Sequence, residues 1–162
     1  MVTVTPALTM LEAARISFSI SEYDRHMSGD GDLRDFGREA AEALGLSADE
    51  VFKTLVVVSE SDELIVAVLP VSCQLSMKLV AAAANVKKVS MCDPSVAERS
   101  SGYVVGGISP LGQRRQLRTV IDESADLFDT IYVSGGRRGL DIGLAPADLA
   151  RVLDATIAPI TA

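Results

Sequence analysis

The sequence predicts one α/β domain, built on a mixed, curved or barrel-like β-sheet with helices around it. Short β-branched runs typical of strands alternate with segments that carry helix caps. These elements interleave without a regular βαβ rhythm, which favours a mixed sheet over a parallel one. The 162 residues are enough for a substantial core, and no linker or repeat divides them. We therefore expect a single domain over residues 1–162.

The first half of the chain is expected to hold two helices and three strands. Thr5 is a helix cap before Pro6, and the helix should run to about Arg15. Alternating apolar residues and serines over 16–20 predict a half-buried strand. The remaining expectations are a Gly/Asp-rich loop at 28–32, a helix over 35–44 ended by Gly45, a capping box at 47–50, and a hairpin of 52–59 and 64–69 around the polar residues 60–63.

The second half is expected to add three helices and four strands. Ser76 caps a helix that runs through Ala84, and Asp93 with Pro94 starts another that reaches about Arg99. The four expected strands are 88–91, 118–122, 130–134 and 140–144. The last helix is expected over 146–153.

The charge balance excludes tight nucleic-acid binding over the whole surface. The formal net charge is −7, whereas affinity for phosphate comes from clustered Lys and Arg. Several basic residues gather in the second half, which leaves room for a local basic patch: Lys87, Lys88, Arg114, Arg115, Arg118, Arg137 and Arg138.

Composition also bears on compartment and cofactors. No signal peptide or long apolar run is visible, so we expect a cytoplasmic protein with no membrane partner. Cys73 and Cys92 have no metal-binding spacing and are interpreted as reduced thiols. His26 is the only histidine, and this argues against a zinc site. We predict no metal and no cofactor.

Two glycine-rich segments are the candidate ligand loops. In residues 102–112, the stretch from Gly106 to Pro110 is either a tight turn or a loop whose N–H groups face an oxyanion. Residues 134–139 are either a hairpin turn or an anion nest to which Arg137 and Arg138 add charge. Neither segment has the spacing of a P-loop or of a dinucleotide fingerprint.

Lys53 is the candidate charged group within a strand. It shares a face with Leu55 and Val57, while Phe52 and Thr54 belong to the other face. The ammonium lies either exposed at the strand end or in a cleft, where it would meet a phosphate or developing negative charge. No nucleophile elbow or acid/base pair stands out, so the protein offers no obvious nucleophile of its own.

Three ordered motifs, at residues 51–55, 100–113 and 131–140, together resemble the YbaK family. These proteins are free-standing relatives of the editing domain inserted in bacterial prolyl-tRNA synthetases, and the resemblance runs from about Pro6 to Ile160. It implies a barrel-like α/β editing fold. It also implies hydrolysis of the ester between a mischarged amino acid and the terminal adenosine of a tRNA, with Cys-tRNA(Pro) and Cys-tRNA(Cys) as substrates.

The resemblance also assigns roles to residues. It implies that Lys53 and Gly106 are catalytic, with Gly106 and Pro110 forming a Gly-x-x-x-Pro loop. Arg137 stands where relatives have lysine, which keeps the charge. The residues expected to bind substrate are Tyr23, Phe36, Gly107, Ser109, Pro110, Ser134, Gly135 and Asp141. The partners implied are the acceptor ends of tRNA(Pro) and tRNA(Cys), together with prolyl-tRNA synthetase, and no DNA.

The family mechanism implied is substrate-assisted: the cysteine thiolate attacks its own ester carbonyl, while the protein positions the reacting groups. Tyr23, Asp141 and water are all candidates for protonating the leaving ribose oxygen. Two alternatives stay open. One is a deacylase for another small aminoacyl ester such as Ala-tRNA(Pro), and the other is a non-catalytic module that binds aminoacyl-adenosine or a nucleotide.

Overall fold

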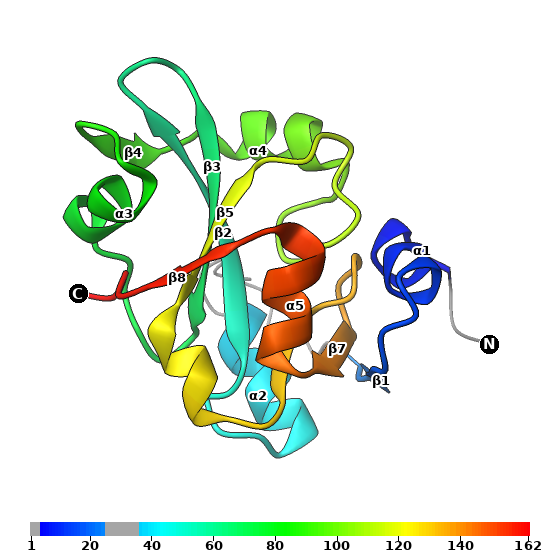
Figure 1. The fold of residues 1–162 in the computed structure, drawn as a ribbon. Helices are drawn as coiled ribbons and strands as arrows, with labels where there is room; N and C mark the ends of the chain where they lie inside the picture. Colours follow the sequence, from blue (N-terminus) through cyan, green and yellow to red (C-terminus); the bar gives the residue numbers. More distant parts are fainter. Residues whose placement is uncertain (1–3, 25–35) are drawn as a thin grey trace.

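The structure is a computed structural model, and it describes residues 4–24 and 36–162. The expected loop at 28–32 and His26 lie outside the described residues. The strands form two sheets with helices packed around them, which confirms the predicted mixed α/β class (Figure 1).

The larger sheet has five strands in the order β4-β2-β3-β5-β8. Its hairpin of β2 and β3 is antiparallel, as predicted, and β4 pairs antiparallel with β2. β5 lies parallel to β3, and β8 lies parallel to β5. The strands span Phe52–Ser59 (β2), Leu64–Pro70 (β3), Val89–Met91 (β4), Arg118–Asp122 (β5) and Thr156–Ala158 (β8).

The smaller sheet is antiparallel, with β7 between β1 and β6. The three strands are β1 (Ser19–Glu22), β6 (Ile131–Ser134) and β7 (Leu140–Leu144). A single parallel bridge between Val51 and Tyr132 joins this sheet to the start of β2. The sequence predicted one curved sheet, whereas the structure has two sheets that this bridge connects.

The helices begin where their caps predict. Thr5 Oγ1 accepts a hydrogen bond from the N–H of Leu8 at 3.3 Å, and Ser76 Oγ accepts one from the N–H of Leu79 at 3.1 Å. No helix among residues 4–24 and 36–162 is both long and apolar enough to cross a membrane. The helices are α1 (Pro6–Ala13), α2 (Phe36–Leu44), α3 (Met77–Ala84), α4 (Pro94–Ser101), α5 (Pro146–Leu153) and the 3-10 helix η2 (Glu123–Leu127).

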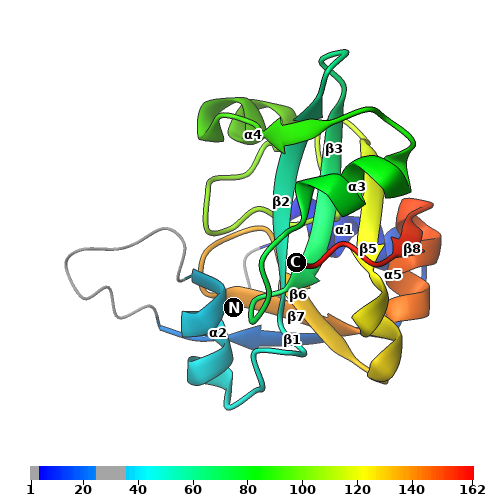
Figure 2. The ribbon, with the colours of Figure 1, turned by 90° about the vertical axis from the view of Figure 1, so that its left-hand side faces the viewer.

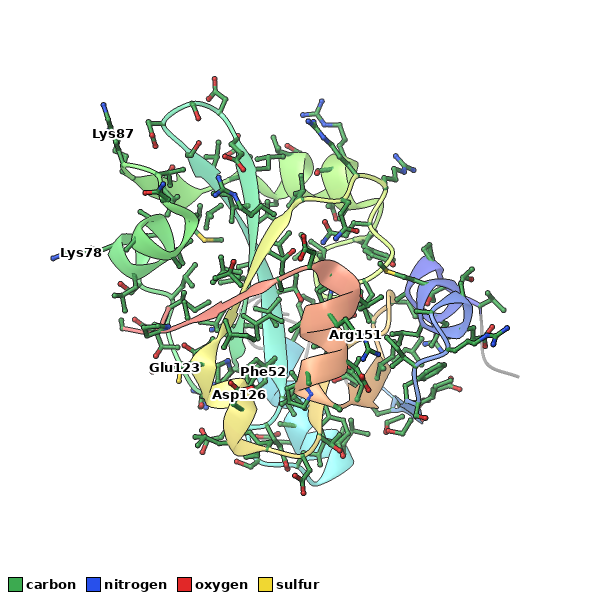
Figure 3. The ribbon with its side chains drawn as sticks, viewed as in Figure 1. Phe52, Lys78, Lys87, Glu123, Asp126 and Arg151 are labelled. Carbon is green, nitrogen blue, oxygen red and sulfur yellow. The ribbon has the colours of Figure 1, made fainter. Side chains whose placement is uncertain are left out.

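The larger sheet separates two hydrophobic cores. In β3, Ile65, Ala67 and Leu69 face α3, whereas Val66 and Val68 face α1, α5 and the smaller sheet (Figures 1 and 2). Figure 3 shows the Phe52 ring of β2 in the interior of the molecule. Because residues pack against both faces of β2, its position within the larger sheet is well defined.

Three elements differ from the expectation. The first strand lies at Ser19–Glu22 rather than 16–20, because Ile16 is buried in the core at the end of the α1 turn. β8 and η2 were not predicted. The Asp122 carboxylate stabilises both, since it accepts hydrogen bonds from the N–H groups of Ser124 at 3.2 Å and Ile160 at 3.0 Å.

Candidate functional site

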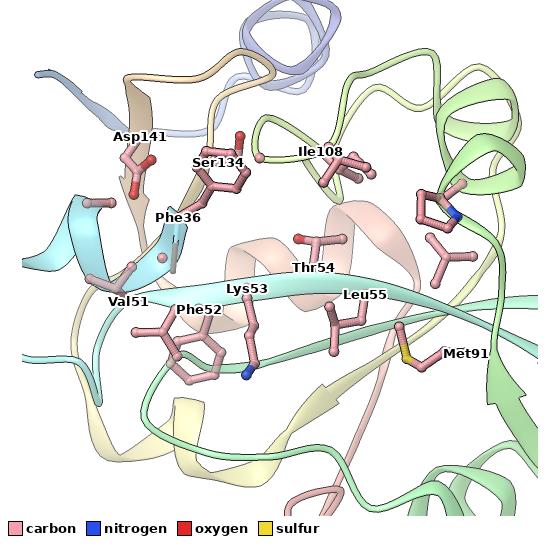
Figure 4. Close-up of a pocket in the computed structure, with 18 of the residues that line it drawn as sticks. Phe36, Val51, Phe52, Lys53, Thr54, Leu55, Met91, Ile108, Ser134 and Asp141 are labelled. Carbon is pink, nitrogen blue, oxygen red and sulfur yellow. The ribbon is translucent and has the colours of Figure 1, made fainter. Parts of the chain in front are cut away.

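A cavity of about 470 Å³ opens beside β2, in the size range of small-molecule sites (Figure 4). Residues 51–56 all line it. Side chains alternate between the faces of a strand, so six consecutive residues can line one cavity only if it runs along the strand's edge. The other walls come from the start of α2, the segment from β4 into α4, the 105–108 loop, and the β6–β7 hairpin.

The smaller sheet supplies the polar end of the cavity. Ser134 on β6 and Asp141 on β7 are direct cross-strand partners, so their side chains lie close together on one face. Tyr23 is held beside them because its N–H donates to the Gly139 carbonyl at 2.9 Å. The Phe36 ring, at the start of α2, completes this end (Figure 4). Four predicted substrate-binding residues are thus brought together.

Asp141 has an unusual protonation state. Its side chain is only 5 % exposed, and burial away from water raises the pKa of its carboxyl from 3.8 to about 7. The carboxyl can therefore hold or release a proton near neutral pH, which suits a group that exchanges protons with a substrate.

Lys53 also lines the cavity, but its ammonium does not point toward Gly106. The side chain leaves β2 on the side opposite Thr54, and Nζ donates a hydrogen bond to the Cys73 carbonyl at 2.7 Å (Figure 4). Burial lowers the pKa of Lys53; the nearby Cys73 thiol opposes this shift and Arg38 adds to it. The cleft alternative for Lys53 fits this position, on the flank of β2 away from Ser134 and Asp141.

The 105–108 loop approaches the opposite flank of β2 and depends on glycine. Gly106 has a φ of +89°, and a Cβ there would lie 2.7 Å from the Phe36 ring. The Gly107 N–H already donates to the Val104 carbonyl at 2.8 Å, so this amide is used within the loop. Glu98 of α4 fixes the loop, because its carboxylate accepts the Val105 N–H at 2.9 Å.

Four predicted substrate-binding residues lie outside the described cavity wall: Gly107, Ser109, Pro110 and Gly135. Ser109 is fully buried, and its Oγ accepts the Leu111 N–H at 3.2 Å while its carbonyl accepts from Gln113 Nε2 at 3.0 Å. A Cβ on Gly107 would lie 2.9 Å from the Arg137 backbone. These residues support the two loops on the side away from the cavity.

The 134–139 segment connects β6 and β7 as a hairpin turn, and two of its glycine amides form hydrogen bonds within the turn. The Gly135 N–H donates to the Leu140 carbonyl at 2.8 Å, and the Gly136 N–H donates to Ser134 Oγ at 3.2 Å. Both amides are therefore already used within the turn.

The two arginines of this turn hold the structure together. Arg137 forms an ion pair of 2.6 Å with Glu22 on β1. Arg138 donates from Nε to the Val105 carbonyl at 2.8 Å, and its guanidinium lies 4.9 Å from the centre of the Phe36 ring. Arg138 thus connects the hairpin, the Gly106 loop and α2.

Thr54 and the apolar end of the cavity were not predicted from the sequence. Thr54 Oγ1 is buried and has no hydrogen-bond partner among the described residues. Its position next to Lys53 in the 51–55 motif could have indicated a site residue. The alternation of side chains along the strand showed only that Lys53 and Thr54 point to opposite faces. The apolar end is lined by Leu55, Val56, Met91, Cys92, Pro94, Ala97 and Ile108.

The cysteines and acidic residues give no metal centre in the described part of the chain. Cys73 and Cys92 are both free thiols, and burial raises the pKa of Cys92, with Asp93 adding to the shift. No group of three or more His, Cys, Asp or Glu side chains that could hold a metal ion occurs within residues 4–24 and 36–162.

Solved structures share this fold. The crystal structure of the hypothetical protein APE2540 matches with a TM-score of 0.85 at 22% identity, covering 98% of this chain and 100% of that one. A crystal structure described as an inferred trans-editing enzyme for prolyl tRNA synthetase matches with a TM-score of 0.78 at 18% identity, covering 99% of both chains.

Sequence comparisons go further than the fold. EbsC of Enterococcus faecalis, named for an inferred Cys-tRNA(Pro)/Cys-tRNA(Cys) deacylase activity, is 34% identical over 160 residues, which cover 97% of this chain and 93% of EbsC. YwhH of Bacillus subtilis, named as an uncharacterized protein, is 27% identical over 111 residues, or 68% of this chain and 70% of YwhH. A family model described as the aminoacyl-tRNA editing domain matches residues 30–152. The chain therefore belongs to the aminoacyl-tRNA editing domain family.

Proposed function

We propose that this protein is a free-standing aminoacyl-tRNA deacylase that removes cysteine from Cys-tRNA(Pro) and Cys-tRNA(Cys). The observation that carries the proposal is the single cavity that gathers six residues from separate parts of the chain: Tyr23, Phe36, Lys53, Gly106, Ser134 and Asp141. The similarity to EbsC supports the same substrates. Because tRNA is used in the cytoplasm, we place the activity there.

Lys53 and Gly106 take different parts of the substrate in this proposal. Gly106 lines the cavity against the Phe36 ring, and in this proposal its N–H stabilises the oxyanion that forms on the ester carbonyl. The Lys53 ammonium lies on the flank of β2 away from Ser134, and it binds the phosphate of the terminal nucleotide. The position of Lys53 thus favours phosphate binding over direct contact with the ester.

The substrate supplies the nucleophile. Its thiol loses a proton and the sulfur attacks the ester carbonyl carbon, so a C–S bond forms and the C–O bond to the ribose breaks. The ribose oxygen takes a proton, and water then opens the resulting thiolactone to give free cysteine. Asp141, whose pKa is about 7, accepts the thiol proton and returns it to the ribose oxygen. Holding thiol and ester together removes most of the entropic barrier.

The test is the rate of deacylation of cysteinyl-, alanyl-, seryl- and prolyl-tRNA(Pro). Fast loss of cysteine alone is expected, since the other side chains lack a thiol. Lys53→Ala is expected to reduce kcat/KM for the cysteinyl substrate by about 100-fold or more, because the phosphate loses its counter-charge.

Two outcomes would contradict this proposal. Rapid release of serine or alanine would exclude the substrate-assisted mechanism. No release of any amino acid, with aminoacyl-adenosine still bound, would identify a binding module instead.

In this proposal a partner protein, rather than the deacylase itself, selects the tRNA. The chain carries a net charge of −7 and offers little to bind a whole tRNA. We therefore propose that it contacts the acceptor end, and that prolyl-tRNA synthetase presents the mischarged tRNA to it.

A further inference from the structure

The edge of β2 that faces the cavity carries main-chain groups turned away from the rest of the sheet. On the β3 side, the Val51 carbonyl accepts the Val71 N–H at 2.8 Å, and the Ser59 N–H donates to the Glu63 carbonyl at 2.9 Å. The ladder to β3 therefore uses the odd-numbered residues of β2. In an antiparallel pair the intervening residues direct their N–H and C=O groups to the opposite side.

Thr54 lies at the centre of a gap on that opposite side. β6 meets the strand only at the Val51–Tyr132 bridge, and β4 pairs with it only from Val57 onward. Near the end of the gap, the Val56 carbonyl accepts the Cys92 N–H at 3.2 Å. Within residues 4–24 and 36–162, no strand pairs with Thr54 on this side, so its N–H and C=O face the cavity.

The Thr54 side chain adds a third polar group without a partner. Its Oγ1 is buried and makes no hydrogen bond within the described part of the chain. Buried polar groups in native proteins are nearly always satisfied. Figure 4 shows Thr54 beneath Ile108, with Leu55 next along β2 and Met91 of β4 beyond Leu55. A polar strand edge between apolar side chains fits a flat ligand that has hydrogen-bonding groups along its own edge.

We propose that this free edge of β2 reads the Watson–Crick edge of the adenine at the end of the tRNA. The Thr54 N–H donates to adenine N1, and the Phe52 C=O, two residues earlier on the same edge, accepts from the adenine N6 amino group. The inference rests on the proposed function, and it adds the location and manner of base recognition.

The shape of the gap favours a base over a peptide strand. Residues 52–56 span about 13 Å at roughly 3.3 Å per residue. β6 occupies one end of the gap and β4 the other. A peptide adding to the edge would collide with both strands after a few residues, whereas a single base fits between them.

The proposed position of the adenine is consistent with the residues found on the two flanks of β2. A base in the plane of the sheet leaves the Lys53 ammonium on one side, and Phe36, Ser134 and Asp141 on the other. Gly106 lies against the Phe36 ring. The terminal phosphate and the ester of one nucleotide can then lie on opposite flanks. Each group meets the residue whose chemistry suits it.

The experiment uses the intact protein and cysteinyl minihelices that differ only in the terminal base. Purine lacks the N6 amino group, 1-deazaadenine lacks N1, and 7-deazaadenine lacks only N7. Relative to adenine, kcat/KM is expected to fall about 10- to 100-fold for purine and for 1-deazaadenine, because each leaves one main-chain group unpaired. It is expected to stay within two-fold for 7-deazaadenine.

A variant pair assigns the effect to the strand edge. Thr54→Pro removes an N–H that makes no bond to β3, so proline is tolerable there. The 1-deazaadenine penalty is expected to disappear in this variant and to persist in Thr54→Val, which loses only the hydroxyl. Thermal unfolding checks that both variants fold.

The outcomes separate this inference from the proposed function. Equal kcat/KM for adenine, purine and 1-deazaadenine, with cysteine still released, would overturn the inference and leave the deacylase intact. A penalty for 7-deazaadenine alone would also overturn it. The wild-type series decides the question even if Thr54→Pro does not fold. If the adenine-ended minihelix is not deacylated at all, the proposed function itself fails.

Discussion

At the scale of single residues, burial of the Asp141 carboxyl has two effects. It lets the group exchange a proton near neutral pH, and it lowers the stability of the folded protein when the group is ionised. Burial of the Asp141 carboxyl away from water raises the pKa of this group to about 7. In the unfolded chain the same group would ionise near 3.8. The folded protein therefore holds this proton more tightly than the unfolded chain does.

Asp141→Asn is expected to stabilise the protein, increasingly so as pH rises. Below the unfolded pKa both states are protonated, and the stability contribution of the raised pKa is fully present. It is lost as pH rises from about 4 to about 7, and the loss amounts to at most roughly 4 kcal/mol. Asparagine cannot ionise, so the gain in Tm should grow over this range and then level off.

The check is thermal unfolding at pH 4.5, 6 and 8, with the exposed Asp129→Asn as the matched control. The same Asp141 variant should lose about 100-fold in kcat/KM, since proton transfer is removed. An equal effect of Asp141→Asn on Tm at all three pH values would show that the carboxyl does not carry the raised pKa.

At the scale of elements, the site depends on contacts between a loop, a hairpin and a helix. Arg138 of the hairpin contacts both Val105 and the Phe36 ring, and Gly106 lies against the same ring. A change in any one of these segments is therefore transmitted to the other two.

Gly106→Ala is expected to displace Phe36 and to lower kcat/KM at least 10-fold. A matched control is Gly45→Ala at the end of α2. Both glycines have positive φ, so each substitution costs about 1 kcal/mol in backbone strain. Only at Gly106 would the new methyl group meet a ring, at 2.7 Å, whereas nothing lies within 4 Å at Gly45.

Deacylation rates and thermal unfolding of the two variants provide the measurement. Gly45→Ala should lose stability alone, while Gly106→Ala should lose activity as well. Equal activity of the two variants would show that the contact between Gly106 and Phe36 does not position the site.

The elements with local signals could be predicted from the sequence. The β2–β3 and β6–β7 hairpins follow from alternation and polar turns, and the α1 and α3 caps follow from Thr5 and Ser76. β8 could not be predicted, because three residues that pair in parallel with the distant β5 carry no local pattern. The division into two sheets likewise depends on one long-range bridge.

The candidate site, like the fold, could be predicted only in part from the sequence. The motifs and the family resemblance that they carry indicated residues that line the cavity at its polar end, including Ser134 and Asp141. They could not show that the Lys53 ammonium turns toward Cys73, or that the Gly107 and Gly135 amides bond within their own loops. Met91 was missed because it reaches the cavity only through the pairing of β4 with β2.

At the scale of the whole molecule, acidic side chains outnumber basic ones, which disfavours binding of a whole tRNA. In Figure 3, Lys78 and Lys87 project on the α3 side, while Arg151 lies on α5 and pairs with Asp148 at 3.0 Å. The chain has 15 Lys and Arg against 22 Asp and Glu. Few phosphates can therefore be neutralised at once.

The salt dependence of binding is expected to be shallow. Two phosphate contacts would give about a ten-fold loss of affinity for aminoacyl-tRNA between 50 and 200 mM salt, compared with at least 1,000-fold for a protein that makes six or more. The isolated protein should also bind tRNA(Pro) and tRNA(Cys) about equally. A steep salt dependence, or a strong preference for tRNA(Pro) without a partner, would contradict acceptor-end recognition.

The bridge at Val51 and Tyr132, the single bridge joining the two described sheets, has a consequence for how such a pocket can diversify. Ser134 and Asp141 at the polar end belong to the smaller sheet, and the main-chain edge of β2 belongs to the larger one. Exchanging Ser134 or its neighbours alters the shape offered to an amino acid without disturbing the strand beside it. Selection, natural or in a library, can thus retarget one end of the cavity while the other end is inherited unchanged.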